Sequence, residues 1–162
     1  MALLRGSGTG VAVGIYTTDF GGIIASGPHA RSPYALAASS LALGAGRLSY
    51  ALGIQGPCLT VDTACSASLV AAYCASTALR RSECDDYVAL GVNLMLAPST
   101  SIGLALAQMM SPTGRSYTFD KRADGFLRGE GCSAFALHAS TDRDGTPLLL
   151  GSAVRQDGKS AS

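Results

Sequence analysis

Charged side chains are scarce in this sequence, and their scarcity excludes a first set of functions. Asp, Glu, Lys and Arg make up 14% of the 162 residues, against about 25% in an average soluble domain. The net charge is +1 and no basic cluster is larger than a pair such as Arg80-Arg81, so nothing indicates binding to nucleic acid or to an anionic membrane. With 48% hydrophobic residues, the chain should bury much of its surface, either in its own core or against other protein.

Long apolar runs and paired cysteines are missing too. No run approaches the roughly 18 residues that a membrane-spanning helix needs, and the first ten residues lack the regions of a signal peptide. The five cysteines are odd in number and include no CxxC pair, which argues against structural zinc and against a secreted disulfide framework. We therefore expect a cytoplasmic protein with free thiols. All cysteines except Cys65 are expected to be small core residues.

Strands and helices alternate along the sequence. Strands are expected at 11–15, 57–63, 86–96, 132–140 and 147–156, with a turn at 142–145 between the last two. Helices are expected at 33–43, 47–52, 66–80 and 99–110. The first of these helices has Ser32 as N-cap, Pro33 at its first position and Gly44 as its stop. This alternation predicts an α/β domain with a mostly parallel central sheet and helices on its faces.

Cys65 stands where an expected strand gives way to an expected helix. The amino end of a helix carries a partial positive charge and unpaired N–H groups. Such a site favours the thiolate form of a cysteine, and the N–H groups can hold the oxygen of a tetrahedral intermediate when an acyl group is attacked. The neighbouring residues 64 and 66–68 are all Ala or Ser, which leaves room for a substrate carbonyl. The local pattern alone slightly favours a buried structural cysteine, because buried free cysteines are common.

The wider sequence resembles a known family. The string "GRLSYALGIQGPCLTVDTACSASLVA" is similar to the active-site region of the β-ketoacyl synthases, the ketosynthase domains of polyketide and fatty acid synthases. The segments "GVNLMLAP", "MMSPTGRSYTFDKRADGFLRGEG" and "GSAVRQDG" follow in the family's order. The resemblance spans almost all of the chain and is strongest to modular type I polyketide synthases. It implies the thiolase-like layered fold, here incomplete, in a domain that is usually a homodimer.

The resemblance also implies a reaction. Cys65 would take an acyl group from the phosphopantetheine arm of an acyl carrier protein, with its backbone N–H forming half of the oxyanion hole. The acyl-enzyme would then be attacked by the carbanion of a decarboxylating malonyl-type extender, giving a β-ketoacyl thioester. No cofactor is expected to bind directly. Ala67 stands where the family more often has serine, and Leu104-Ala105 where it often has Phe-Ser.

Two histidines that the family uses are not matched in this chain. Only His29 and His138 are present, and neither lies in an "HGTGT"-type or "NxGH"-type motif. We expect His29 in a loop, His138 at a strand end, and neither in catalysis. The 162 residues are therefore interpreted as the part of a ketosynthase domain that carries the nucleophile, without its first elements and its C-terminal half. As a fragment, the chain should accept an acyl group on Cys65 but not complete the condensation.

Other interpretations remain open. A non-catalytic piece that keeps the fold and a dimer surface is favoured by the low charge and the missing histidines. A thiolase or another thiolase-like acyltransferase is a third alternative, since that group shares a cysteine at a helix start. Three acids of the turn-rich segment 111–131, Asp120, Asp124 and Glu130, follow no metal-binding spacing. We expect them to be solvated or to pair with nearby Arg and Lys residues.

Overall fold

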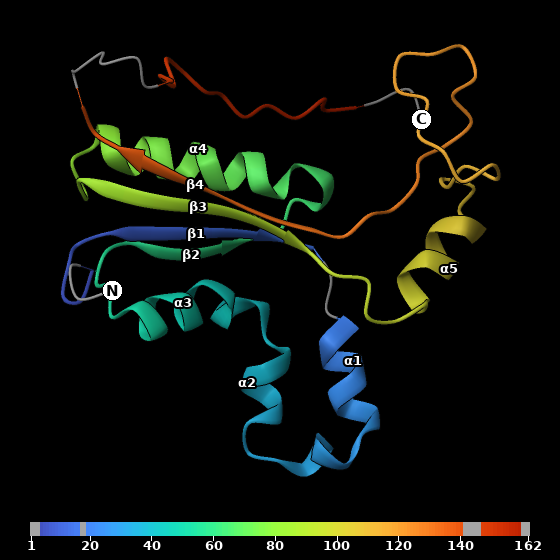
Figure 1. Ribbon diagram of the computed structural model, residues 1–162, viewed down its shortest axis with the longest axis horizontal. Coiled ribbons are helices and arrows are strands. Elements are labelled where there is room, and N and C mark those ends of the chain that lie inside the picture. The colour runs from blue at the N-terminus through green and yellow to red at the C-terminus, as the bar shows by residue number, and fades with distance from the viewer. Residues whose placement is uncertain (1–3, 17–18, 141–146, 160–162) are drawn as a thin grey trace. The chain divides into compact units, whose positions relative to one another are not determined.

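The computed structural model describes residues 4–16, 19–140 and 147–159. The strands are β1 Gly10–Ile15, β2 Cys58–Val61, β3 Asp86–Asn93 and β4 Gly131–His138. The α-helices are α1 Asp19–Ser26, α2 Ala35–Ser39, α3 Gly44–Leu52, α4 Ala67–Arg80 and α5 Ser99–Leu106 (Figure 1). Short 3-10 helices cover Pro28–Arg31, Leu41–Leu43 and Ala64–Ser66.

The chain folds into two compact units. The first contains Met1–Tyr16, Ala42–Gly91 and Ser133–Ser162, and the second contains Thr17–Leu41 and Val92–Cys132. In the first unit the strands form one sheet in the order β2-β1-β3-β4. β1 and β2 run parallel, with Val11 opposite Cys58 and Gly14 opposite Val61. Figure 1 shows α4 and α3 on opposite sides of these strands, so the predicted sheet with helices on its faces is confirmed.

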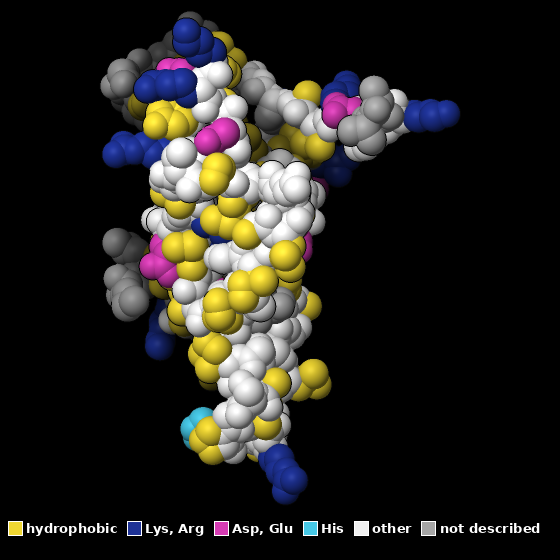
Figure 2. All heavy atoms as spheres, turned by 90° about the vertical axis from the view of Figure 1, so that its right-hand side faces the viewer, with side chains coloured by type: hydrophobic (Ala, Val, Ile, Leu, Met, Phe, Trp, Pro, Cys, Tyr) yellow, Lys and Arg dark blue, Asp and Glu magenta, His cyan; other side chains and the backbone are white. Residues whose placement is uncertain are grey.

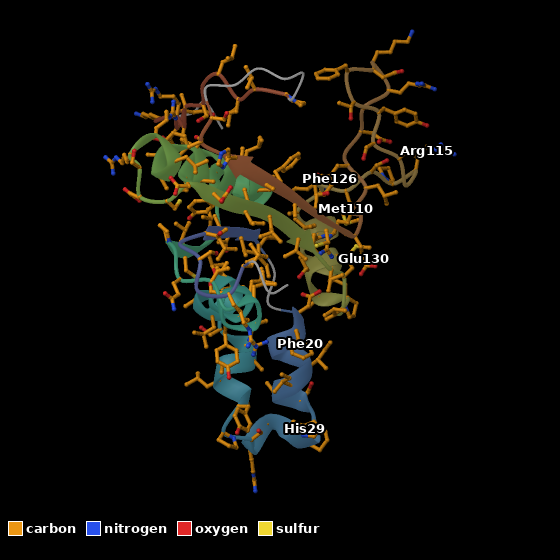
Figure 3. All side chains as sticks on the ribbon, turned by 60° about the vertical axis from the view of Figure 1, so that its left-hand side comes forward. Phe20, His29, Met110, Arg115, Phe126 and Glu130 are labelled. Atoms are coloured by element: carbon orange, nitrogen blue, oxygen red, sulfur yellow. The ribbon has the colours of Figure 1, made fainter. Side chains whose placement is uncertain are left out.

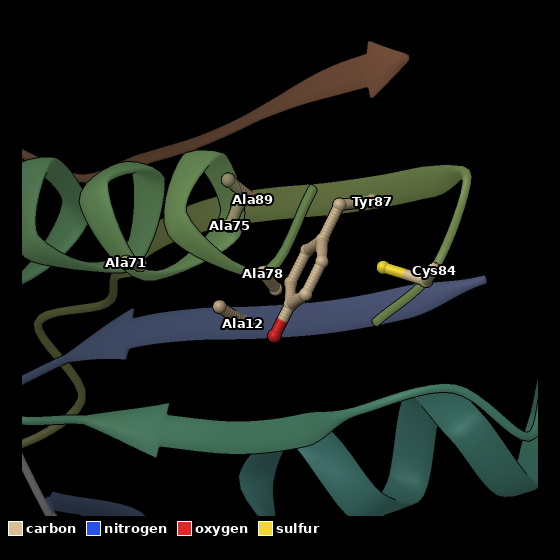
Figure 4. Packing of buried hydrophobic residues seen from close by; sticks show 7 residues of the cluster. All are labelled: Ala12, Ala71, Ala75, Ala78, Cys84, Tyr87 and Ala89. Carbon is tan, nitrogen blue, oxygen red and sulfur yellow. The ribbon is translucent and has the colours of Figure 1, made fainter. Parts of the chain in front are cut away.

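The core of the first unit consists mainly of alanines. Ala71 and Ala75 of α4 are fully buried and meet Ala12 of β1 and Ala89 of β3 (Figure 4). Side chains two residues apart in a strand share a face, so the small residues of both strands point at α4. Tyr87 fills the end of this cluster at 1% exposure, and burial, which disfavours the phenolate, raises its pKa to about 12.

The second unit is mainly helical. α1 and α2 pack against each other, and a Cβ on Gly21 of α1 would lie 2.9 Å from Cβ of Ser39 in α2. The helix expected at 33–43 is wrong at both ends. α2 begins at Ala35, with Tyr34 and not Ser32 as its N-cap, and it ends at Ser39, before the extended Ser40. Gly44 starts α3 instead of stopping the preceding helix. α1 is not among the helices expected from the sequence.

Two further expectations fail. The helix expected at 99–110 is shorter, because α5 ends at Leu106. Met110 instead forms an isolated parallel bridge with Phe126, beside which it lies in Figure 3. Residues 147–156 form no strand, although the apolar run suggested one. This segment instead lies beside α4, and Oγ of Ser152 is 3.0 Å from Oγ of Ser76 in that helix. The turn expected at 142–145 lies outside the described residues.

Hydrophobic side chains remain on the surface. Figure 2 shows many of them on its visible face, among few charged groups. The most exposed large examples, all above 70%, are Phe119, Tyr50, Leu150, Leu36, Leu106, Tyr34 and Leu69. The buried face of α4 is formed mainly by alanines, which leaves Leu69 in solvent. None of the helices in the described part of the chain is both long and apolar enough to cross a membrane.

Candidate active site

Cys65 lies in a tight elbow between β2 and α4. β2 ends at Val61, a 3-10 turn covers Ala64–Ser66, and α4 begins at Ala67. Ala64, directly before the cysteine, has φ 52°, which is a left-handed conformation that L-residues avoid. The chain therefore turns sharply from strand to helix, with Cys65 at the apex.

Side chains on both sides of Cys65 hold this elbow. Oδ1 of Asp62 accepts a hydrogen bond from the backbone N–H of Ala64 at 3.0 Å, which fixes the turn before the cysteine. After the cysteine, Oγ of Ser66 donates to the carbonyl of Thr63 at 2.8 Å. The backbone N–H of Ala67 bonds to the carbonyl of Ala64. Hydrogen bonds between residues on either side of Cys65 thus hold the elbow, and none of these three bonds involves an atom of Cys65.

The side chain of Cys65 is exposed and its thiol is free. Within the region that the structure describes, the backbone N–H of Cys65 donates to no protein carbonyl. The thiol is therefore open to a reagent, and the N–H group of the same residue has no backbone partner among the described residues. This pairing of nucleophile and donor is what acyl transfer requires.

The other cysteines differ from one another. Cys84 is buried and Cys74 half-buried, and burial raises the pKa of each thiol, because a thiolate is poorly solvated there. Cys58 and Cys132 are exposed, so the expectation that all four are core residues is wrong for these two. Cys58 opens the edge strand β2 and Cys132 lies in β4, and neither is next to a helix start.

The histidines lie where the sequence placed them or close to it. His29 is exposed within the 3-10 turn between α1 and α2 (Figure 3). His138 is the last residue of β4, and its Nδ1 lies 2.8 Å from Oδ1 of Asp86, at the start of β3. Both histidines are exposed.

A polar cluster of the second unit was not predicted from the sequence. Oδ2 of Asp19 accepts hydrogen bonds from the backbone N–H groups of Leu96 at 3.2 Å and Ala97 at 3.1 Å, and Oδ1 accepts one from Thr100 Oγ1 at 3.0 Å. Burial opposes ionisation of Asp19, but these three bonds and the charge of Arg128 outweigh it, so its pKa lies below its ordinary value. Asp19 thereby fixes the chain at the start of α5.

The acids of the turn-rich segment behave in different ways. Asp120 pairs with Arg122, Nη2 to Oδ2 at 2.8 Å, and these bonds hold its pKa below the ordinary value. The guanidinium also stacks on the Tyr117 ring at 4.5 Å. Glu130, labelled in Figure 3, accepts instead a bond from the backbone N–H of Met95 at 2.8 Å. Among the described residues, no group of three or more Asp, Glu, His or Cys side chains could hold a metal ion.

Comparison with known proteins supports the family resemblance. The family model of the β-ketoacyl synthase N-terminal domain matches residues 1–143. A phenolphthiocerol/phthiocerol polyketide synthase of Mycobacterium tuberculosis is 42% identical over 162 residues, which cover 97% of this chain and 10% of that protein. The mycocerosic acid synthase-like polyketide synthase of Mycolicibacterium smegmatis is 40% identical over 98% of this chain and 8% of its own length.

A solved structure agrees with both matches. The ketosynthase from module 6 of the bacillaene synthase of Bacillus subtilis 168 superposes with a TM-score of 0.74 and 34% identity, covering 85% of this chain and 23% of that chain. The fold is thus the mixed, mostly parallel sheet with helices of the thiolase-like ketosynthases. The chain spans about a tenth of the curated relatives and under a quarter of the solved ketosynthase. With the elbow at Cys65 in place, these matches show that the chain belongs to the β-ketoacyl synthase family.

Proposed function

We propose that this chain supplies the nucleophile of a ketosynthase and that Cys65 is the residue that carries the acyl group. The thiolate of Cys65 attacks the carbonyl carbon of an acyl thioester. The bond from that carbon to the donor sulfur breaks, and the donor thiol leaves with the proton that Cys65 has lost. The backbone N–H of Cys65 stabilises the oxyanion formed in between. The observation that carries the proposal is an exposed cysteine in a strained strand-to-helix elbow, with its own N–H group available beside the sulfur.

In a complete domain, the second half of the reaction follows on the same carbon. Loss of carbon dioxide from a malonyl-type thioester leaves an enolate, which attacks the acyl carbon and releases Cys65 as the thiolate. The substrates arrive on the phosphopantetheine arm of an acyl carrier protein. Neither histidine of the chain lies in one of the family's two histidine motifs, so we expect acylation by the 162 residues and no condensation. Five free thiols among the described residues suit a reducing cytoplasm.

Incubation with an acyl thioester of N-acetylcysteamine, a short mimic of the pantetheine arm, tests the acyl transfer. Intact mass should increase by one acyl group, and peptide mapping should place it on Cys65. Cys65→Ala should abolish the increase, whereas Cys58→Ala and Cys132→Ala, which remove the other exposed thiols, should not. An unmodified Cys65 in a protein with a cooperative unfolding transition would refute the proposal.

A specific observation also favours assembly into a homodimer. β2 is the first strand in the sheet order β2-β1-β3-β4 and therefore an edge strand, whose unpaired backbone groups can extend the sheet into a second copy. The exposed apolar side chains also leave surface to be covered. Light scattering should give the mass of two chains, and Cys58→Pro, which removes an N–H on the outer edge of β2, should reduce it to one. A monomer at all concentrations would exclude this assembly and the non-catalytic scaffold alternative that depends on it.

A further inference from the structure

Two glycines on neighbouring strands leave room for the first turn of α4. Gly14 lies near the end of β1 and Gly91 near the end of β3. A Cβ on Gly14 would lie 2.5 Å from the carbonyl carbon of Ala67 and from the backbone nitrogen of Ser68. A Cβ on Gly91 would lie 2.6 Å from Cβ of Ser68. Carbon atoms attract one another only at about 3.5–4.0 Å, so neither methyl group fits.

The same strands carry methyl groups further along α4. Ala12 and Ala89 each lie two residues before one of these glycines, on the same face of their strand. Both are buried against Ala71 and Ala75, in the middle of α4. The helix therefore rests on alanine side chains along its middle and directly on the strand backbone at its first turn. That end of the helix is the one that carries the elbow.

The contact at the first turn is linked to Cys65 by a short and rigid path. Ala67 is two residues after the cysteine, and its backbone N–H bonds to the carbonyl of Ala64 on the other side of the cysteine. Peptide planes are stiff and this hydrogen bond closes the turn around the cysteine, so a displacement of the peptide between Ala67 and Ser68 moves Cys65 and its N–H group with it. A methyl group under this peptide would lift the turn from the sheet.

We propose that Gly14 and Gly91 are positioning residues for Cys65, because they set how closely the first turn of α4 approaches the sheet. Neither glycine belongs to the elbow, so they act through Ala67 and Ser68. The inference rests on the proposed acyl transfer by Cys65. It goes beyond it by assigning the placement of the sulfur and its N–H donor to two residues on other strands.

The two glycines face different atoms, which makes a sharp test possible. Gly91 faces the side chain of Ser68, so the clash created by Gly91→Ala disappears when Ser68 is also changed to glycine. Gly14 faces backbone atoms of Ala67 and Ser68, which no side-chain truncation removes. Ser68→Gly should therefore rescue Gly91→Ala but not Gly14→Ala. Gly46→Ala is the matched control, because no atom lies within 4 Å of a Cβ there.

The rate of Cys65 acylation is measured in the full chain over a range of thioester concentrations, with the unfolding midpoint of each variant. Gly91→Ala and Gly14→Ala should lower the limiting rate about tenfold or more, since small misplacements of a reacting group are costly. The half-saturating thioester concentration should stay the same. Gly91→Ala/Ser68→Gly should return to the rate of Ser68→Gly alone. If the single variants do not fold, this double variant still decides, because a folded but slow double variant contradicts the proposal.

Alkylation of Cys65 by iodoacetamide, followed by peptide mapping, separates this inference from the proposed function. Alkylation needs no acyl transfer, so it reports on the placement of the sulfur even if the wild-type chain is never acylated. The rate of Cys65 alkylation should differ from wild type in both Gly14→Ala and Gly91→Ala. It should return to the rate of Ser68→Gly in Gly91→Ala/Ser68→Gly, and should not do so when Ser68→Gly is combined with Gly14→Ala. Wild-type rates of both reactions in a folded Gly91→Ala chain would overturn the proposal. A double variant that recovers the unfolding midpoint but neither rate would show that Gly91 is only structural.

Discussion

Replacing Ala64 by glycine should stabilise the protein, because this residue adopts a conformation that glycine accepts without strain. Its φ of 52° lies in the left-handed region, where an L-residue costs roughly 1–2 kcal/mol. Glycine avoids most of that cost but loses roughly 0.4–1 kcal/mol through its greater freedom in the unfolded chain. The balance is a gain of about 0.5–1 kcal/mol in the free energy of unfolding. For a chain of this length, that corresponds to an unfolding temperature about 1–4 °C higher.

Urea denaturation of the wild-type chain and of Ala64→Gly measures the difference, provided that both unfold with the same dependence on denaturant. Ala67→Gly is the matched control, since it lies three residues later with helical φ −55° and ψ −42°. There, glycine should destabilise by roughly 0.5–1 kcal/mol, because a helical site gives it no strain to relieve, and by about 0.8 kcal/mol more, because Ala67 is buried and loses its methyl group. If Ala64→Gly is destabilised as much as Ala67→Gly, the elbow is not strained and the reasoning fails.

Three further changes probe the rest of the structure. The lowered pKa of Asp19 means that its carboxylate stabilises the fold above the unfolded-chain value of about 3.9 and that this stabilisation is lost as the pH falls through the folded pKa. Asp19→Asn should therefore be less stable than wild type in urea at pH 7, with a difference that shrinks near pH 3; a constant difference would contradict this. Phe119→Gly should raise the urea midpoint, because Phe119 has φ 62° and a fully exposed ring, and an unchanged or lower midpoint would argue against strain there. Tyr87→Ala should lower the free energy of unfolding by roughly 3–5 kcal/mol, as for other buried aromatic residues. Tyr87→Phe should lower it by under about 1 kcal/mol, because the hydroxyl of Tyr87 reaches the carbonyl of Val11 only at 3.5 Å. Similar losses in the two variants would show that the hydroxyl matters more than the ring.

The elements predicted correctly are those whose signal is local. β1 and β3 are apolar runs with valines, β4 is an apolar run around Phe135, and each strand lies within a few residues of the expected bounds. α4 begins one residue after the expected start and ends at Arg80 as expected. The elbow at Cys65 belongs to this group, because strand, turn and helix follow each other within ten residues.

The elements predicted wrongly depend on partners far away in the sequence. Gly44 was interpreted as a helix stop, yet it begins α3, and a Cβ there would lie 3.1 Å from Oγ1 of Thr60 in β2. Gly44 therefore lets the start of α3 lie close to β2, and a rule based on neighbouring residues in the sequence cannot predict this contact. The run at 147–156 has the composition of a strand, but a strand also needs a neighbour, and this segment lies along α4 instead. Asp19 likewise showed no signal, because its partners are 77–81 positions away.

The candidate site divides along the same line. A cysteine before a helix of small residues is a local pattern and predicts a nucleophile, whereas the position of that nucleophile depends on how closely the helix meets the sheet. That distance is set by Gly14 and Gly91, which are 77 residues apart in the sequence and are recognisable only once β1 and β3 are known to be neighbours. The last glycine of "GVAVG" and of "YVALG" therefore does more than fit the core, because it also positions the first turn of α4. A larger side chain at either glycine would move the first turn of α4, and with it the one sulfur that the proposed reaction needs in place.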